Sequence, residues 1–179
     1  HKAAATLFEL DSHQHSIEIN RRVGFLPAEM GLYESMKGRQ YFRFVERARG
    51  VSCMAEAERL ADILDFDMDH QLSGLSTGNK RKVGLIQAMM HKPDLLILDE
   101  PTSGLDPLMQ QKFNELVLQA RDDGRTVFLS SHNLTEVQTL CDRVGILREG
   151  TLRAVEQVED LMNLSFRWVD IHFADTDVD

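Results

Sequence analysis

Two acidic residues directly follow an apolar run, and carboxylates in that place are suited to phosphoryl transfer. Residues 95–98 read LLIL, and Asp99 and Glu100 come next. At the carboxyl end of a buried strand, side chains project into the crevice where α/β sheets bind ligands. One carboxylate there can hold Mg²⁺, and the other can position and polarise an attacking water. We expect Asp99 to bind the metal and Glu100 to act on the water. A solvated strand end that happens to be acidic is the alternative.

A serine and a glycine at a predicted helix start are suited to binding a phosphate. Residues 75–79 read LSTGN. The free N–H groups of a helix N-terminus attract anions, Ser76 adds a hydroxyl, and Gly78 lets an anion approach the backbone closely. Residues 80–82 are all basic. Basic residues in a first turn oppose the helix dipole, which indicates that function outranks helix stability here. An ordinary serine N-cap is the alternative.

Two more polar residues follow predicted elements. His132 comes after the strand-like run TVFLSS, where a histidine can hydrogen-bond a terminal phosphate. A plain surface histidine is the alternative. Asp106 ends the turn SGLD, and its alternative role is to cap a helix that begins near Pro107.

Alternating strands and helices must position these residues. Apolar runs predict strands at 22–27, 95–98 and 126–130, the latter two buried on both faces. Helices are expected between them, one over 79–91 and one with its buried side formed by Phe113, Leu116, Val117 and Ala120. This order predicts an α/β core with a parallel sheet and right-handed crossovers.

Other segments extend this core. A short strand is expected at 6–10. A small layer of helices is expected before residue 74. One helix would have its apolar face formed by Tyr41, Phe44, Val45 and Ala48, and the following helix by Ala57, Leu60, Ala61 and Leu64. Beyond residue 130 we expect a helix lined by Leu134, Val137 and Cys141, strands at 144–147 and 151–154 around a turn, and an added strand at 167–173.

Composition limits the possible functions. The 179 residues suffice for one domain, or one core with an appendage, and the net charge of −9 argues against sequence-independent nucleic-acid binding. No apolar run approaches the roughly 18 residues of a membrane span. Cys53 and Cys141 form no disulfide framework, and both are expected as small buried residues in a reducing compartment.

The order of these motifs resembles that of the ATP-binding-cassette (ABC) ATPases, the nucleotide-binding subunits of ABC transporters. LSTGN is similar to the family signature LSGGQ, LLILDEP to the Walker B strand with its catalytic glutamate, SGLD to the D-loop and SSH to the switch histidine. VGFLPAEMGLYESM resembles the Q-loop region of multidrug and ABC-2 exporters. The resemblance extends to about Leu161. It departs from the signature at Thr77 and Asn79.

The resemblance implies a P-loop NTPase-like (RecA-like) core with an inserted helical subdomain. Its parts would be residues 1–33 (incomplete ATPase core with the Q-loop region), 34–78 (helical signature subdomain), 79–155 (ATPase core) and 156–179 (C-terminal extension). ATP and Mg²⁺ are the implied ligands. Asp99 would hold the metal, Glu100 and His132 would be catalytic, and Ser76, Gly78 and Asp106 would close over ATP held by a second cassette. The Q-loop glutamine falls at Ala28, with Glu29 beside it as a possible substitute.

The Walker A loop does not occur in the sequence. No glycine is followed by lysine, and the first residue is His1 rather than Met. Since that loop provides most of the phosphate grip, we expect an N-terminally truncated chain that cannot hydrolyse ATP alone. We also expect a marginal, aggregation-prone monomer, because the missing segment would leave apolar strands exposed.

The resemblance implies an ATPase subunit that powers transport, in particular export of drugs or small hydrophobic compounds. Its partners would be a second cassette in a head-to-tail dimer and an integral membrane permease, which places it in the cytoplasm at the inner face of the cell membrane. No nucleic-acid partner is expected. The alternatives are a soluble ABC-type ATPase that is not tied to transport and a degenerate subunit that only regulates a partner.

Overall fold

The computed structural model describes residues 5–160, which divide into two units. The first unit extends to His132, and the second begins at Asn133. The first unit contains the parallel sheet and the helical layer, and the second contains a helix and a hairpin. Each unit is described by itself.

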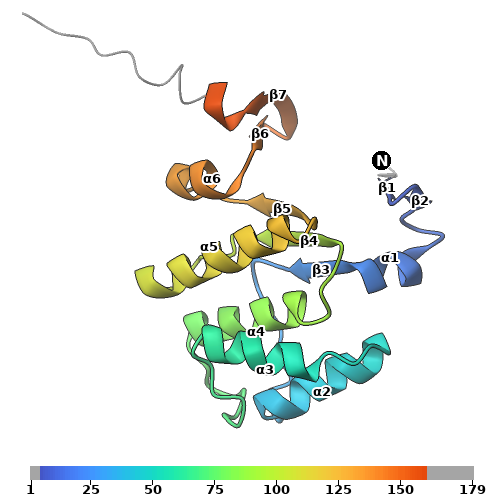
Figure 1. Ribbon diagram of the computed structural model, residues 1–179, viewed down its shortest axis with the longest axis vertical. Coiled ribbons are helices and arrows are strands. Elements are labelled where there is room, and N and C mark those ends of the chain that lie inside the picture. Colours follow the sequence, from blue (N-terminus) through green and yellow to red (C-terminus); the bar gives the residue numbers. More distant parts are fainter. Residues whose placement is uncertain (1–4, 161–179) are drawn as a thin grey trace, which may run out of the picture. The chain divides into compact units, whose positions relative to one another are not determined.

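A three-stranded parallel sheet forms the centre of the first unit (Figure 1). Its order is β3 (Val23–Leu26), β4 (Leu95–Asp99) and β5 (Thr126–Ser130). The register places Val23 opposite Leu95 and Asp99 opposite Ser130. β3 ends before Pro27, which has no N–H to donate to a neighbouring strand. The predicted strands and their parallel pairing are confirmed.

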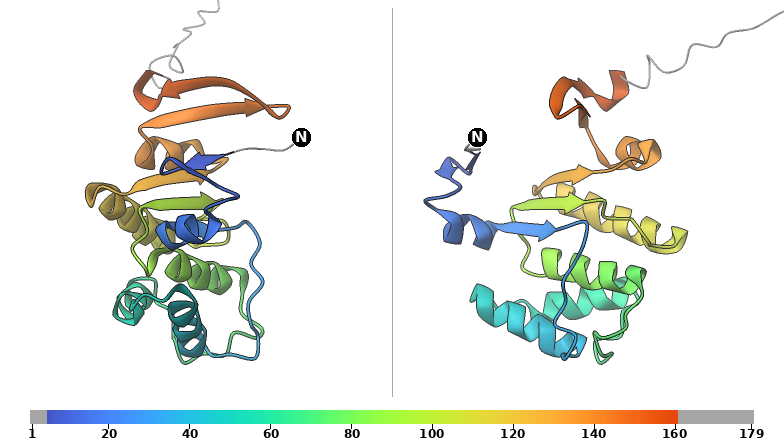
Figure 2. Two further views of the ribbon diagram at one scale, coloured as in Figure 1. Left: turned by 90° about the vertical axis from the view of Figure 1, so that its right-hand side faces the viewer. Right: turned by 180° about the vertical axis from the view of Figure 1, so that it is seen from behind.

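Helices α4 (Thr77–Met89) and α5 (Pro107–Asp122) lie against one face of this sheet (Figure 2). Leu96 is fully buried beneath them, and a Cβ added at Gly24 would lie 2.0 Å from the Ala88 carbonyl oxygen, so α4 rests directly on β3. The predicted helical side of α5 is confirmed, because all four of its apolar residues are buried.

The opposite face of the sheet is only partly covered by the described residues. Phe25, Ile97 and Phe128 lie side by side across the three strands. Phe25 is 51% exposed and Phe128 is 66% exposed. The prediction that β5 is buried on both faces is therefore wrong. The reason is that β5 is at the edge of this sheet, and its side chains alternate between exposed and half-buried.

The N-terminal segment forms a small hairpin rather than one strand. β1 (Thr6–Leu7) pairs with β2 (Leu10–Asp11), and the predicted single strand at 6–10 is wrong. Phe8 and Glu9 have φ values of 55° and 65°, and this left-handed backbone reverses the chain. Helix α1 (Ser16–Arg22) follows, and its Ile19 packs against β3 and β4.

The helical layer consists of α2 (Gly38–Arg49) and α3 (Met54–Ile63), as predicted. The expected core face of α2 is wrong at Phe44 and at Ala48, which are both exposed. Phe44 is 43% exposed, whereas Phe42 is fully buried. Both fit a helical period, and packing selects the face that carries Tyr41, Phe42 and Val45. Cys53, just before α3, is buried as expected.

The second unit contains α6 (Leu134–Leu140), β6 (Arg143–Arg148) and β7 (Thr151–Gln157). The two strands pair antiparallel around Glu149 and Gly150, which confirms the predicted hairpin. The predicted lining of α6 is wrong at Leu134, which is 75% exposed, and Cys141 is half-buried just beyond the helix end. The strand expected at 167–173 lies outside the described residues.

Within residues 5–160, no helix is long and apolar enough to cross a membrane.

Candidate functional site

The two acidic residues at the end of β4 meet a serine at the end of β5. Because Asp99 and Ser130 are register partners in adjacent parallel strands, their side chains come to the same edge of the sheet. The Ser130 hydroxyl donates a hydrogen bond to Oδ1 of Asp99, at 2.5 Å. The same hydroxyl oxygen accepts a hydrogen bond from the backbone N–H of Glu100, at 3.2 Å. One side chain of β5 therefore contacts both acidic residues.

Glu100 has a strained backbone that turns its side chain toward His132. Its φ is 46°, a left-handed value that costs a non-glycine residue on the order of 1 kcal/mol. The Glu100 N–H also points at the Ser130 carbonyl oxygen, 3.2 Å away. Oε2 of Glu100 lies 2.8 Å from Nδ1 of His132. With a proton on Nδ1 donated to the carboxylate, a neutral imidazole has Nε2 left as an acceptor.

Solvent reaches this group of residues. The side chain of His132 is 85% exposed and that of Glu100 is 32% exposed. A ligand can therefore contact both without moving the strands. The structure brings Asp99, Glu100 and His132, which were expected as one site, into a single hydrogen-bonded group.

A buried arginine joins helix α4 to the ends of β3 and β4. Arg81 is 6% exposed, and its guanidinium donates to the carbonyl oxygens of Pro27 at 2.8 Å, Ala28 at 3.1 Å and Asp99 at 3.4 Å. Burial lowers the pKa of Arg81, and the nearby charges of Asp99 and Glu100 oppose that shift. Carbonyl dipoles and these two carboxylates thus compensate a buried cation.

The contacts of Arg81 explain why basic residues occupy the first turns of α4. The helix dipole disfavours them there, but Arg81 and Lys82 both donate to main-chain carbonyls outside the helix. The Nζ atom of Lys82 lies 3.0 Å from the Asp65 carbonyl oxygen. The basic run was expected to reflect function rather than helix stability, and at Arg81 and Lys82 the structure gives a structural reason instead.

The segment 75–79 begins α4 and packs against the turn at 103–106. The Ser76 hydroxyl accepts a hydrogen bond from the Asn79 N–H at 3.3 Å, so Ser76 is an N-cap. A Cβ added at Gly78 would lie 2.8 Å from the Gly104 carbonyl oxygen, which leaves no room for a side chain. Gly104 itself has a φ of 78°. The glycine at position 78 is therefore required for packing, whatever ligand the helix start binds.

Asp106 and Glu29 form no hydrogen bond with Asp99, Glu100 or His132. Oδ1 of Asp106 accepts hydrogen bonds from the N–H groups of Leu108 at 3.0 Å and Met109 at 3.1 Å, so Asp106 caps α5. Glu29 is exposed and follows Ala28, whose carbonyl oxygen Arg81 binds. The structure thus forms one group around Asp99 and Glu100, and a second around residues 76–78 and 104.

Sequence reasoning missed two residues of the site. Ser130 was assigned only to a strand, although pairing the two predicted strands at their polar ends would have placed it beside Asp99. From the sequence, Arg81 is only one member of a basic run. No sequence signal identifies the carbonyl groups that it binds, because they come from a loop 54 residues earlier and from β4.

The residues of the site fit Mg²⁺ better than a metal that is bound by three or more protein side chains. Among residues 5–160, no group of three or more His, Cys, Asp or Glu could hold a metal ion. Asp99 is thus a single carboxylate donor beside a hydroxyl. Mg²⁺ is commonly held by one or two carboxylates together with water and substrate phosphates, which matches this donor set.

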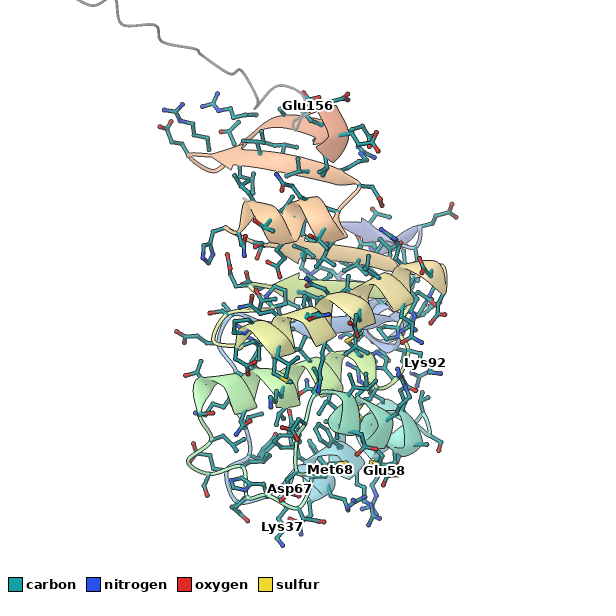
Figure 3. The ribbon with its side chains drawn as sticks, turned by 60° about the vertical axis from the view of Figure 1, so that its left-hand side comes forward. Lys37, Glu58, Asp67, Met68, Lys92 and Glu156 are labelled. Carbon is teal, nitrogen blue, oxygen red and sulfur yellow. The ribbon has the colours of Figure 1, made fainter. Side chains whose placement is uncertain are left out.

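A surface hollow on the helical layer lies outside this site. It has a volume of about 470 Å³, and Glu58, Asp67 and Met68 are among its lining residues (Figure 3). Arg39 forms ion pairs there with Glu58 at 2.5 Å and with Asp69 at 3.6 Å. None of the residues expected to act on a phosphate lines this hollow.

The chain is similar to known ATP-binding proteins. Residues 5–103, more than half of the chain, match the family model described as ABC transporter. The chain is 31% identical over 161 residues to an uncharacterized ABC transporter ATP-binding protein of Methanocaldococcus jannaschii, covering 85% of this chain and 60% of that protein. It is 32% identical over 153 residues to the linearmycin resistance ATP-binding protein of Bacillus subtilis, covering 83% of this chain and 49% of that protein.

A solved structure has the same fold. It is described as the ATP binding subunit of an ABC transporter, and the superposition has a TM-score of 0.80 at 27% identity. The match covers 89% of this chain and 68% of the solved one. The chain spans about half to three fifths of the length of the two curated relatives.

Proposed function

Since the chain belongs to the ABC transporter family as an ATP-binding domain, we propose that it binds Mg²⁺-ATP and takes part in the ATP hydrolysis that drives transport through a membrane partner. The observation that carries this proposal is the hydrogen-bonded group of Asp99, Glu100, Ser130 and His132 at one edge of the parallel sheet. Ligands of open α/β sheets bind at the carboxyl ends of the strands, where this group lies.

Each residue of the group has a role in the proposed reaction. Asp99 would hold Mg²⁺, which neutralises charge on the phosphates when it is bound. Glu100 would accept a proton from the attacking water, and its hydrogen bond to His132 holds the carboxylate in one orientation. His132 would donate a hydrogen bond to the terminal phosphate through Nε2 when both ring nitrogens carry a proton.

The second group of residues would serve a partner's nucleotide. We propose that Ser76, Gly78 and Asp106 face the ATP bound by a second cassette in a head-to-tail dimer. The exposed N-terminus of α4 supports this role, because its N–H groups and Ser76 attract a phosphate. Glu29 is proposed to take the place of the Q-loop glutamine. We also propose, from the family resemblance, that the parts of the chain end at residues 33, 78 and 155.

The helical layer would contact the membrane permease. Tyr33 is 55% exposed and Phe44 is 43% exposed, and their rings meet edge to face with centroids 5.4 Å apart. Exposed aromatic pairs of this kind are common at protein interfaces. We propose that the permease binds here, which would place the chain at the inner face of the membrane. Export of a drug-like compound is proposed because one relative is named for linearmycin resistance.

The test is a Glu100→Gln substitution in the native protein with its partners. Hydrolysis of Mg²⁺-ATP should fall by about 100-fold or more, because a general base contributes roughly 10²–10⁴-fold. ATP binding should remain, since the amide keeps the shape of the side chain. Glu115→Gln on the exposed side of α5 is the matched control and should leave hydrolysis unchanged. Full activity in Glu100→Gln would contradict the proposed function.

A further inference from the structure

The Ser130 hydroxyl occupies a position between two residues with different proposed roles. Its oxygen is 2.5 Å from Oδ1 of Asp99 and 3.2 Å from the backbone nitrogen of Glu100. A serine hydroxyl has one proton to donate and two lone pairs to accept with. The proton therefore goes to the Asp99 carboxylate, and a lone pair accepts the Glu100 N–H.

Each of these hydrogen bonds constrains one acidic residue. The bond to Asp99 is charge-assisted, which makes it roughly twice as strong as a neutral one, and it limits rotation of the carboxylate. The bond from Glu100 supports a backbone with a φ of 46° that would otherwise be disfavoured. Outer groups that orient a metal ligand in this way tune the affinity of the site for the metal.

Ser130 is not needed to satisfy a buried group. The residue is exposed, so water could replace its hydroxyl without leaving a polar atom unpaired. The Glu100 N–H also has the Ser130 carbonyl oxygen as a second acceptor, at 3.2 Å. Removing the hydroxyl should therefore change the orientation of Asp99 more than it changes the stability of the fold.

We propose that Ser130 is a positioning residue that orients the Asp99 carboxylate for Mg²⁺. This inference rests on the proposed function, in which Asp99 is the metal ligand. It assigns to β5 a part in divalent-cation binding. Loss of the hydroxyl lowers the affinity of the site for the divalent cation and leaves nucleotide binding without metal unchanged.

The experiment compares Ser130→Thr with Ser130→Val, two side chains of the same shape that differ in the hydroxyl. MnCl₂ is titrated into the native protein with a non-hydrolysable ATP analogue, and bound Mn²⁺ is measured by electron paramagnetic resonance. The Mg²⁺ concentration that gives half-maximal hydrolysis is measured in parallel. Thr126→Val is the matched control, because it removes a hydroxyl from the other end of the same strand on the same face.

In Ser130→Val, the Mn²⁺ concentration for half-maximal binding and the Mg²⁺ concentration for half-maximal hydrolysis should each rise about 10-fold. Loss of other groups that hydrogen-bond a metal ligand has effects of this size. Ser130→Thr should stay close to wild type, and neither the urea midpoint nor nucleotide affinity without metal should change. Equal cation dependence in the Thr and Val variants would overturn the inference. The inference would also be overturned if Ser130→Val lowered the urea midpoint and the metal-free nucleotide affinity as well as the affinity for the cation.

Failure of the proposed function would look different. In that case the wild-type protein itself would show no divalent-dependent nucleotide binding and no hydrolysis. A wild-type protein that binds and hydrolyses, beside a Val variant with unchanged cation dependence, overturns only the role of Ser130.

Discussion

The Nδ1 atom of His132 lies 2.8 Å from the Oε2 atom of Glu100, although 32 positions separate the two residues in the chain. They meet because β4 and β5 are adjacent parallel strands and each residue follows the end of its own strand. Glu100 contributes to the contact through its left-handed backbone. The pair links the carboxylate that we propose acts on water with the imidazole that we propose contacts a phosphate.

Replacing His132 with alanine should reduce hydrolysis more than binding. The substitution removes the hydrogen bond that orients the Glu100 carboxylate, and we expect turnover to fall about 100-fold or more. The affinity for ATP should change only a few-fold. The measurement is steady-state hydrolysis beside equilibrium binding of ATP. His70→Ala, at an exposed position on the helical layer, is the control. An equal loss of binding and turnover would assign His132 to ATP binding alone.

Arg81 should prove important for stability. Arg81→Met removes a buried cation that donates to three main-chain carbonyl oxygens, at Pro27, Ala28 and Asp99. Leaving buried acceptors without donors costs about 1–3 kcal/mol, so the free energy of unfolding should fall by about that amount. Urea denaturation followed by circular dichroism measures it. Arg43→Met, on the exposed side of α2, should change the midpoint little.

A methyl group at position 78 should disturb the contact between the start of α4 and the turn at 103–106. In Gly78→Ala the new Cβ would be placed 2.8 Å from the Gly104 carbonyl oxygen, so one segment must move. We expect a loss of about 1–3 kcal/mol in unfolding free energy, typical of overpacking. We also expect weaker ATP-dependent association of two cassettes, measured by light scattering. Gly31→Ala is the control, because a Cβ there meets no atom within 4 Å.

Stability should fall between pH 6.5 and pH 4 because of His91. Burial, reinforced by the neighbouring Arg49, lowers the pKa of His91 from 6.5 to about 4. Arg49 Nη1 lies 3.0 Å from His91 Nε2. The unfolded chain therefore takes up a proton at higher pH than the folded one. The stabilising effect of His91 is complete above pH 6.5 and is lost as the pH falls toward 4.

The measurement is the urea midpoint at pH 7 and pH 5 for the wild type and for His91→Gln. The free energy of unfolding of the wild type should decrease from pH 7 to pH 5. Because the ring is partly exposed, we expect His91 to account for only about 1 kcal/mol of that decrease, and this part should be absent in His91→Gln. His70→Gln should keep the full decrease, since His70 is exposed. A wild-type decrease that is unchanged in His91→Gln would show that other groups cause it.

The sequence by itself determined the strands β3, β4 and β5, their parallel arrangement and the helices between them. Apolar runs that alternate with helical patterns require such an arrangement. It also placed Asp99, Glu100 and His132 at strand ends, which brings side chains together once the strands are parallel. These are consequences of local pattern and chain order, and they need no knowledge of individual contacts.

Only the tertiary structure decided which residues meet across the chain. Two left-handed residues, Phe8 and Glu9, reverse a segment whose apolar pattern fits a single strand. Packing buried Phe42 and left Phe44 exposed, although both fit a helical period. Ser130 and Arg81 joined the site through contacts to atoms at a long sequence distance, to Asp99 in one case and to loop carbonyl groups in the other. The physical reason is that a local pattern specifies an element and one of its faces, whereas hydrogen bonds between elements depend on the register and packing of the whole core.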